Sequence, residues 1–289
     1  MTRLTAEHYR EFRRQIEQEK HDRIREFEDE IANDARMAVA KAAAPAVLRM
    51  LAQGDSWFDY LPGGHVDIVA HLASLTPLTP KILKLAHYGE ATEDMLGLKK
   101  LSELRDQLRN PKAAPFDAIL FSGGGNDLAG NQFRLWLTER TAAGGNPSAG
   151  LNRARVAAVL GVIRAGYEDL IATRDAFASS AWIFTHGYDF AIPTGKGVCN
   201  VGPWLQPGLA DRGWSALAEG TAIVRDLLLE FDALLTSLAA SAGKFVYVRT
   251  QGTLSSGDWD NELHPLPSGF AALTGKFVDE LRRVFPGRI

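Results

Sequence analysis

The sequence predicts an α/β fold, a three-layer α/β/α sandwich with a mainly parallel five-stranded sheet and an N-terminal helical extension. Two observations predict it. Short apolar runs of β type alternate along the chain with longer stretches of helical periodicity. The chain has 289 residues, of which 46% are hydrophobic, and this is ample for a core of that size. Because parallel neighbours require crossover connections, helices are expected to cover both faces of the sheet.

The first 44 residues form the predicted extension, ahead of a domain over residues 45–289. From Thr5 to about Arg36 the chain is dense in charged residues, and apolar residues recur at helical intervals. This pattern predicts a long amphipathic helix. Its apolar seam is thin, so the helix either packs on the body of the protein, which we favour, or pairs with a second copy as an oligomerisation arm. Pro45 interrupts the alanine-rich continuation and lets a strand begin.

Strands and helices are predicted to alternate through the rest of the chain. The strands are expected at Val47–Ala52, Ile82–Ala86, Ala118–Phe121, Trp182–Thr185 and Phe245–Arg249. The helices are expected at Val66–Leu75, about Glu93–Leu108, Leu151–Phe177, Trp214–Ala240 and Gly269–Val284. Two long segments, Ala129–Gly150 and His186–Gly213, are rich in glycine, proline and aromatic residues. We expect binding loops there, with plain surface insertions as the alternative.

Charge and composition exclude several classes of partner. The net charge is −3 and the pI is about 6.2, and no basic tract follows the N-terminal segment, so neither nucleic acid nor an anionic membrane is expected as a partner. The N-terminus is charged from Arg3 onward, and no run of 18 apolar residues occurs. We therefore expect a cytoplasmic protein without stable membrane insertion. No cofactor is predicted.

The tripeptide Gly54-Asp55-Ser56 closes an apolar stretch. A strand that ends at a glycine-led turn presents the next side chain at the carboxyl edge of the sheet, where open α/β folds place their sites. Ser56 is therefore a candidate nucleophile. The same residue types also form helix-capping turns, so the rest of the chain must supply a base and an anion-stabilising site.

Two further strand ends carry polar or glycine-rich turns. After the third strand, the run from Ser122 to Asp127 places Asn126 on a turn with three glycines. The run lacks the Lys-Ser/Thr pair of a nucleotide P-loop, whereas a side-chain amide is a suitable donor to a developing oxyanion. After the second strand, Gly89 offers a backbone N–H, or forms a plain turn.

His264 is the candidate base. It precedes the last predicted helix, and Pro265 and Pro267 restrict the loop that holds it. His186 follows a strand directly and heads an aromatic loop, so it stays a second candidate. The other histidines lie in apolar segments or in the charged N-terminal helix.

Taken together, these residues resemble the SGNH (GDSL-type) hydrolase family of esterases and lipases, which has a flavodoxin-like fold. The resemblance rests on Gly54-Asp55-Ser56, Gly89, the turn around Asn126, and His264, in this order at successive strand ends. It implies that Ser56 is the nucleophile and His264 its base. It also implies an oxyanion hole made by the backbone N–H groups of Ser56 and Gly89 and by the amide of Asn126. The implied substrate is a small-molecule ester.

The chain departs from the family pattern at the third member of the triad. The pattern is Asp-x-x-His, but Asn261 stands three residues before His264. We expect a carboxylate from Asp258 or Asp260 to contact Nδ1 through a different loop, with Asn261 as the alternative. The alternating acids there lack the glycine and the distant Glu of a calcium loop, so no metal is predicted.

Aromatic residues are the candidates for substrate binding. Trp57, Tyr188 and Trp204 could line an acyl or sugar pocket, although packing of loops onto the sheet would explain each of them equally well. Two other functions stay open: the irregular triad permits a catalytically weak ligand-binding module, and the long charged N-terminal helix permits an assembly protein built on the hydrolase fold.

Overall fold

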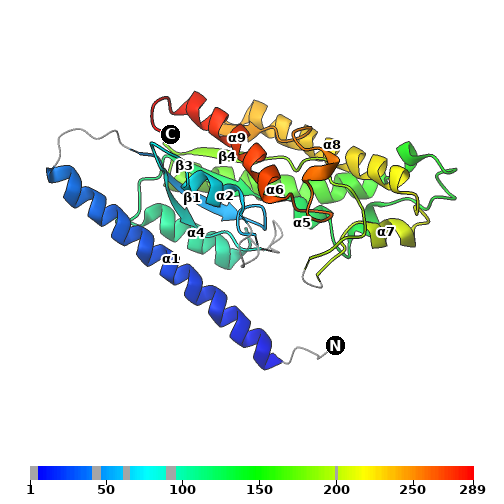
Figure 1. Ribbon diagram of the computed structural model, residues 1–289, viewed down its shortest axis with the longest axis horizontal. Coiled ribbons are helices and arrows are strands. Elements are labelled where there is room, and N and C mark those ends of the chain that lie inside the picture. The colour runs from blue at the N-terminus through cyan, green and yellow to red at the C-terminus, as the bar shows by residue number, and fades with distance from the viewer. Residues whose placement is uncertain (1–5, 41–46, 61–65, 89–95, 199–200) are drawn as a thin grey trace.

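The sheet is parallel throughout and has five strands, as predicted. The computed structural model describes residues 6–40, 47–60, 66–88, 96–198 and 201–289. The strands are β1 Arg49–Gly54, β2 Lys81–Lys84, β3 Ala118–Ser122, β4 Trp182–His186 and β5 Phe245–Val248. They are arranged in the order β2-β1-β3-β4-β5, and Figure 1 labels β1, β3 and β4 in the middle of this sheet. The expected boundaries lie within two residues of the observed ones, and three of the five strands begin at the predicted residue.

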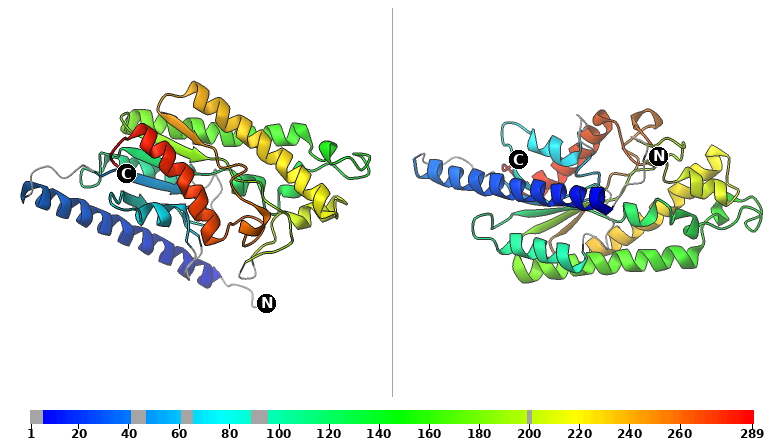
Figure 2. Two further views of the ribbon diagram at one scale, coloured as in Figure 1. Left: turned by 45° about the horizontal axis from the view of Figure 1, so that its top comes forward. Right: turned by 90° about the horizontal axis from the view of Figure 1, so that it is seen from below.

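Helices cover both faces of the sheet (Figure 2). Helices α2 and α9 pack together on one face, and α4, α6 and α8 lie on the other. Their bounds are α2 Ile68–Ala73, α4 Leu98–Arg109, α6 Arg153–Phe177, α8 Leu217–Ser241 and α9 Pro267–Val284. Each corresponds to a predicted helix. The three-layer sandwich is thus confirmed.

The sequence did not predict several short helices in the long connections. They are α5 Gly125–Leu128, α7 Gln206–Asp211 and the 3₁₀ turns Phe133–Trp136, Pro147–Ala149 and Ser256–Asp258. Segments of three to six residues are too short to show a helical period, and they contain glycine and proline, which indicate turns. Both expected binding loops therefore contain ordered helical turns.

The order of the strands changes direction at β1. From β1 the chain moves outward to β2 and then returns to the other side of β1 as β3. At such a switch point, the connections leaving two neighbouring strands go to opposite faces, and a crevice forms beyond their carboxyl ends. Gly54 at the end of β1 pairs with Ser122 at the end of β3. The turns after these two strands therefore border one crevice.

Helix α1, Ala6–Ala40, packs against the edge strand β2. Phe27 is buried and stacks on Phe116, with ring centroids 5.8 Å apart. The Arg23 guanidinium donates to the carbonyl of Ala86, just beyond β2, at 3.2 Å. The helix thus packs on the body, which is the arrangement we favoured, and it covers a sheet edge that would otherwise be open to another strand. Pairing with a second copy stays a prediction.

Replacing Phe27 with Ala should lower the free energy of unfolding by about 3 kcal/mol, because a large buried ring is removed from the seam between α1 and the body. Urea unfolding followed by circular dichroism measures this loss. Met37→Ala is the matched control, since Met37 is on the same helix but is 58% exposed, and we expect a change within about 0.5 kcal/mol. Equal losses in the two variants would contradict a specific packing role for Phe27.

Candidate active site

Ser56 lies in the turn that follows β1. Gly54 ends the strand so close to β3 that a Cβ there would lie 2.7 Å from the Cβ of Ser122. The backbone N–H of Asp55 donates to the carbonyl of Ser122 at 3.1 Å, and the N–H of Phe58 donates back to the carbonyl of Asp55 at 3.0 Å. The strand therefore ends in a tight turn that carries the partly exposed Ser56 side chain into the crevice.

The loop before α9 brings His264 to this serine. Ser56 Oγ and His264 Nε2 are 2.7 Å apart, although 208 residues separate them in sequence. Trp259 and Pro265 form an antiparallel bridge, and the N–H of Asp260 donates to the carbonyl of His264 at 2.9 Å. These backbone contacts join the two ends of the segment 259–265, which therefore forms a small closed loop. The structure thus brings the candidate nucleophile and base into direct contact.

Asn261 determines which imidazole nitrogen carries the hydrogen. Its Oδ1 accepts from the backbone N–H groups of Leu263 and His264, each at 3.0 Å, and lies 2.9 Å from His264 Nδ1. Backbone N–H groups only donate, so the atom facing them must be the amide oxygen. An oxygen cannot donate to Nδ1, and Nδ1 therefore carries the hydrogen. Nε2 is left with a lone pair directed at the Ser56 hydroxyl.

The expectation that Asp258 or Asp260 contacts Nδ1 is corrected by this geometry. The Asp258 carboxylate accepts from the N–H and hydroxyl of Ser255 at 2.8 and 2.6 Å, and so caps a 3₁₀ turn. These hydrogen bonds hold the pKa of Asp258 below its usual value. Asp260 Oδ1 lies 3.3 Å from Lys196 Nζ. Since the loop keeps its closed shape, the residue three before the histidine faces Nδ1, and in this chain that residue is Asn261.

The glycine-rich turn after β3 carries Asn126 to the same crevice. Gly124, at φ +107°, caps helix α5 in a conformation that favours glycine. A Cβ on Gly125 would lie 2.6 Å from the Tyr188 ring, so this position also needs glycine. Asn126 lines one cavity with Ser56 and His264. Gly89, the other expected oxyanion donor, lies outside the described residues.

A buried polar cluster lies beneath the Ser56 turn. The Asp55 carboxylate accepts from the backbone N–H of Trp57 at 3.0 Å and from the Tyr188 hydroxyl. The Ser122 hydroxyl lies 2.8 Å from Asp55 Oδ1 and 2.8 Å from His186 Nε2. His186 therefore supports the turn that carries Ser56, through its contact with Ser122. Ser56 contacts His264 instead, so the alternative assignment of His186 as its base has no geometric support.

When Asp55 is ionised, two acceptors in this polar cluster, Asp55 Oδ1 and His186 Nε2, face the one hydroxyl hydrogen of Ser122. His186 Nδ1 faces the carbonyl of Gly187 at 3.0 Å, so Nδ1 carries the hydrogen and Nε2 accepts. The single hydroxyl hydrogen of Ser122 cannot serve both Nε2 and the Asp55 carboxylate. Burial favours the neutral form of both titratable groups: it raises the pKa of Asp55 to about 6 and lowers the pKa of His186 to about 4.

Two buried carboxylates that the sequence analysis missed hold the loops around the site. The Glu262 carboxylate accepts four backbone N–H groups at 2.6–3.0 Å, and Asp189 accepts four more at 2.6–2.9 Å. The donors to Glu262 are Gly195, Trp204, Leu205 and Gln206, and those to Asp189 are Phe190, Gly252, Thr253 and Leu254. Acidic residues inside glycine- and proline-rich loops were the only sequence signal for them.

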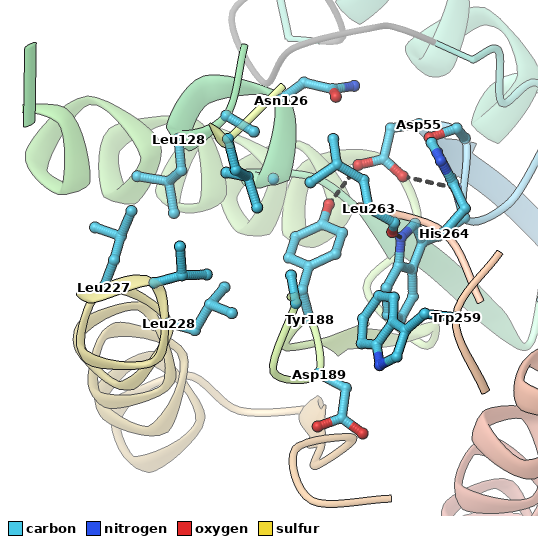
Figure 3. A pocket seen from close by; sticks show the side chains of 17 residues that line it. Asp55, Asn126, Leu128, Tyr188, Asp189, Leu227, Leu228, Trp259, Leu263 and His264 are labelled. Atoms are coloured by element: carbon cyan, nitrogen blue, oxygen red, sulfur yellow. Dashed lines mark hydrogen bonds between the residues drawn. The ribbon is translucent and has the colours of Figure 1, made fainter. Parts of the chain in front are cut away.

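The cavity beside Ser56 is apolar and small, with a volume of about 50 Å³ (Figure 3). Aliphatic side chains make up about half of its lining, and Figure 3 shows Leu128, Leu227 and Leu228 on the side opposite Tyr188. The complete aliphatic set is Leu128, Ala129, Ala191, Leu205, Val224, Leu227, Leu228 and Leu263. These residues could not be predicted to line a cavity, because the periodicity of a helix such as α8 shows that one face is buried and does not show what that face contacts.

The three aromatic candidates have different positions. Trp57 and Tyr188 line the cavity, but both are largely buried. The indole N–H of Trp57 donates to the carbonyl of Leu263 at 3.0 Å, and so supports the residue before His264. Trp204 packs edge-on against the His264 ring, with centroids 5.6 Å apart. Their binding roles stay predictions.

Within the described ranges, no cluster of three His, Cys, Asp or Glu side chains could hold a metal ion. None of the helices in that part of the chain combines the length and apolarity needed to span a bilayer.

Replacing Asp55 with Asn should change how stability depends on pH. Asp55 binds a proton more tightly in the folded protein than in the unfolded chain, so the stability from this group is present below pH 4 and is lost as the pH rises through about 6. Asparagine cannot release a proton in this range, so the variant does not lose this stability as the pH rises. Between pH 4 and 7, we expect the free energy of unfolding of Asp55→Asn to rise by about 2 kcal/mol relative to the natural chain.

Urea unfolding at several pH values provides the measurement. The control is Asp279→Asn, which replaces an exposed carboxylate on α9. It should keep the pH dependence of the natural chain. Parallel curves for Asp55→Asn and the natural chain would show that Asp55 does not titrate in this window.

The comparisons with known proteins identify the fold. No family model and no curated protein matches the sequence. In structure the chain is similar to an extracellular lipase from Streptomyces rimosus, at 18% identity and a TM-score of 0.50, over 81% of this chain and 99% of the lipase. It is similar to a lipase from a goat rumen metagenome at 15% identity and a TM-score of 0.51, over 81% and 97%. The chain therefore has the α/β/α fold of these lipases, which is the fold expected from its resemblance to SGNH hydrolases.

Proposed function

We propose that this protein is a serine hydrolase that cleaves carboxylic esters through an acyl-serine intermediate. The observation that carries the proposal is the 2.7 Å contact of Ser56 Oγ with a His264 Nε2 whose lone pair faces the hydroxyl. A serine hydroxyl is inert at neutral pH until a base within hydrogen-bond reach takes its proton. The lipases with this fold add support at the level of fold alone.

In the first step, Ser56 Oγ attacks the ester carbonyl carbon while its proton moves to His264 Nε2. The carbonyl oxygen becomes an oxyanion, for which the Ser56 N–H and the Asn126 amide are the proposed donors, with the Gly89 N–H as a third by family resemblance. Each such donor is worth roughly 3 kcal/mol of barrier. The C–O bond to the alcohol then breaks, and His264 returns the proton to the leaving alkoxide.

In the second step, water attacks the acyl carbon and gives its proton to His264 Nε2. The bond to Ser56 Oγ breaks, and the proton returns to the serine as the carboxylic acid leaves. Nδ1 keeps its hydrogen throughout, and Asn261 accepts that hydrogen bond in every state. A neutral amide orients the ring as a carboxylate does, so the acid-base cycle is complete without a carboxylate in direct contact.

The apolar cavity favours a short acyl chain. Its walls offer hydrocarbon contacts next to the reacting serine, and its volume of about 50 Å³ is about a third of the ~150 Å³ of an apolar cavity that binds benzene. We infer that acyl groups of about two to four carbons fit it best. The polar alcohol portion would then leave toward solvent.

Ser56→Ala should abolish turnover of p-nitrophenyl acetate and butyrate, with a loss of at least about 1000-fold in kcat/KM, because the nucleophile is removed. Ser237→Ala, on the exposed side of α8, is the control and should retain the natural rate. Mass spectrometry after treatment with a p-nitrophenyl phosphonate should find the adduct on Ser56. If turnover on every chain length is independent of Ser56, the protein is a binding or assembly protein instead.

Two substitutions of Leu227 should shift the acyl preference in opposite directions. Leu227→Ala enlarges the cavity, so the ratio of kcat/KM for octanoate to that for butyrate should rise at least about fivefold, and Leu227→Phe should favour acetate. Leu229→Ala is the control, because Leu229 is on the same helix and is 43% exposed. Melting curves verify that the variants are folded. An unchanged profile in both Leu227 variants would place the acyl group elsewhere.

A further inference from the structure

The amide of Asn261 is held on its far side as well as on the side facing His264. Its Nδ2 donates to the Tyr60 hydroxyl at 2.9 Å and lies 3.3 Å from Asp260 Oδ2. The Tyr60 hydroxyl in turn donates to Asp260 Oδ2 at 3.2 Å. Both amide hydrogens therefore have acceptors, and the three side chains form a closed hydrogen-bonded ring behind the imidazole. Asn261 itself is 3% exposed.

The ring contains a negative charge close to His264. Burial raises the pKa of Asp260, but the hydrogen bond and charge of Lys196, together with the bonds from Tyr60 and Asn261, outweigh burial and leave the pKa below its usual value. Asp260 is therefore a carboxylate at neutral pH. A negative charge at Nδ2 polarises the amide and makes Oδ1 a stronger acceptor, because linked hydrogen bonds strengthen one another.

Tyr60 also contacts the imidazole directly. Its ring stacks on His264 with centroids 4.4 Å apart and an angle of 28°. Tyr60 lies in the turn that carries Ser56, whereas Asn261 and His264 lie in the loop before α9. One side chain thus links the two segments whose separation decides whether Ser56 reaches Nε2. The electron-rich ring face also favours the positive charge that His264 gains during the reaction.

We propose that Tyr60 and Asp260 are positioning residues of the esterase proposed above: they hold the Asn261 amide with its oxygen toward His264 and relay the Asp260 charge through it to the imidazole. In a catalytic triad a carboxylate usually contacts Nδ1 directly. Here the Asn261 side-chain amide lies between Nδ1 and the Asp260 carboxylate. The proposal rests on the proposed function, but the orientation of the ring can be measured without any turnover.

The first test is the NMR signal of the His264 Nδ1 hydrogen in protein labelled with ¹⁵N-histidine. In the natural chain it should be a downfield resonance protected from exchange with water. In Tyr60→Phe and in Asp260→Asn it should move upfield or be lost to exchange. Asp258→Asn, which removes the neighbouring carboxylate that has no contact with Asn261, should leave it unchanged. An unchanged signal in both Tyr60→Phe and Asp260→Asn overturns the proposal.

The second test is a double-mutant cycle on p-nitrophenyl butyrate. Asp260→Asn should lower kcat about tenfold with little change in KM, the effect of about one hydrogen bond. In an Asn261→Asp background the carboxylate contacts Nδ1 directly, so Asp260→Asn should cost less than about twofold. A purely structural role of Asp260 predicts equal losses in both backgrounds, which would overturn the relay. If the natural chain shows no Ser56-dependent turnover, the proposed function fails, and the NMR test still decides the positioning role.

Discussion

The close pairing of β1 and β3 at Gly54 and Ser122 determines where Ser56 and Asn126 of the candidate site lie. The strand order reverses at β1, and the absence of a side chain on Gly54 lets the two strands stay paired to their carboxyl ends. The turns that leave these ends carry Ser56 and Asn126, respectively. Only the base must come from elsewhere. It comes from the loop before α9, which covers the same face of the sheet as α2.

Buried carboxylates make the loops of this site as well defined as its strands. Asp189 and Glu262 each lie in the interior and accept four backbone N–H groups. An unpartnered buried carboxylate would be costly, whereas several N–H donors replace its lost hydration. The donors lie in residues 190–195, 204–206 and 252–254, and of these only Gln206, the first residue of α7, belongs to a helix or strand. The walls of the cavity and the surroundings of His264 are thereby fixed before any ligand arrives, as electrostatic catalysis requires.

The strands and the main catalytic candidates could be predicted because both depend on local patterns. Apolar β-type runs mark the five strands. Ser56 and Asn126 follow strand ends, and His264 stands in a proline-restricted loop before the last helix, so all three could be proposed from sequence. The partner of Nδ1 could not be predicted, because it depends on how the loop between Trp259 and Pro265 closes through backbone hydrogen bonds. The cavity wall at Leu227 could not either, since periodicity shows only that one face of α8 is buried. The role of Tyr60 could not be predicted either, because a hydroxyl contact across about 200 residues has no sequence signal.

With Asn261 in contact with His264, the negative charge of the site does not have to be buried beside the imidazole. A buried carboxylate at position 261 would have to lose its hydration, whereas the neutral amide is buried with a hydrogen-bond partner for its oxygen and for each of its hydrogens. The charge is instead on Asp260, which is 24% exposed and paired with the exposed Lys196. Orientation and charge are thus assigned to two adjacent residues. Because an amide has a fixed donor end and a fixed acceptor end, the arrangement requires a partner that holds the donor end, and Tyr60 together with Asp260 provides it.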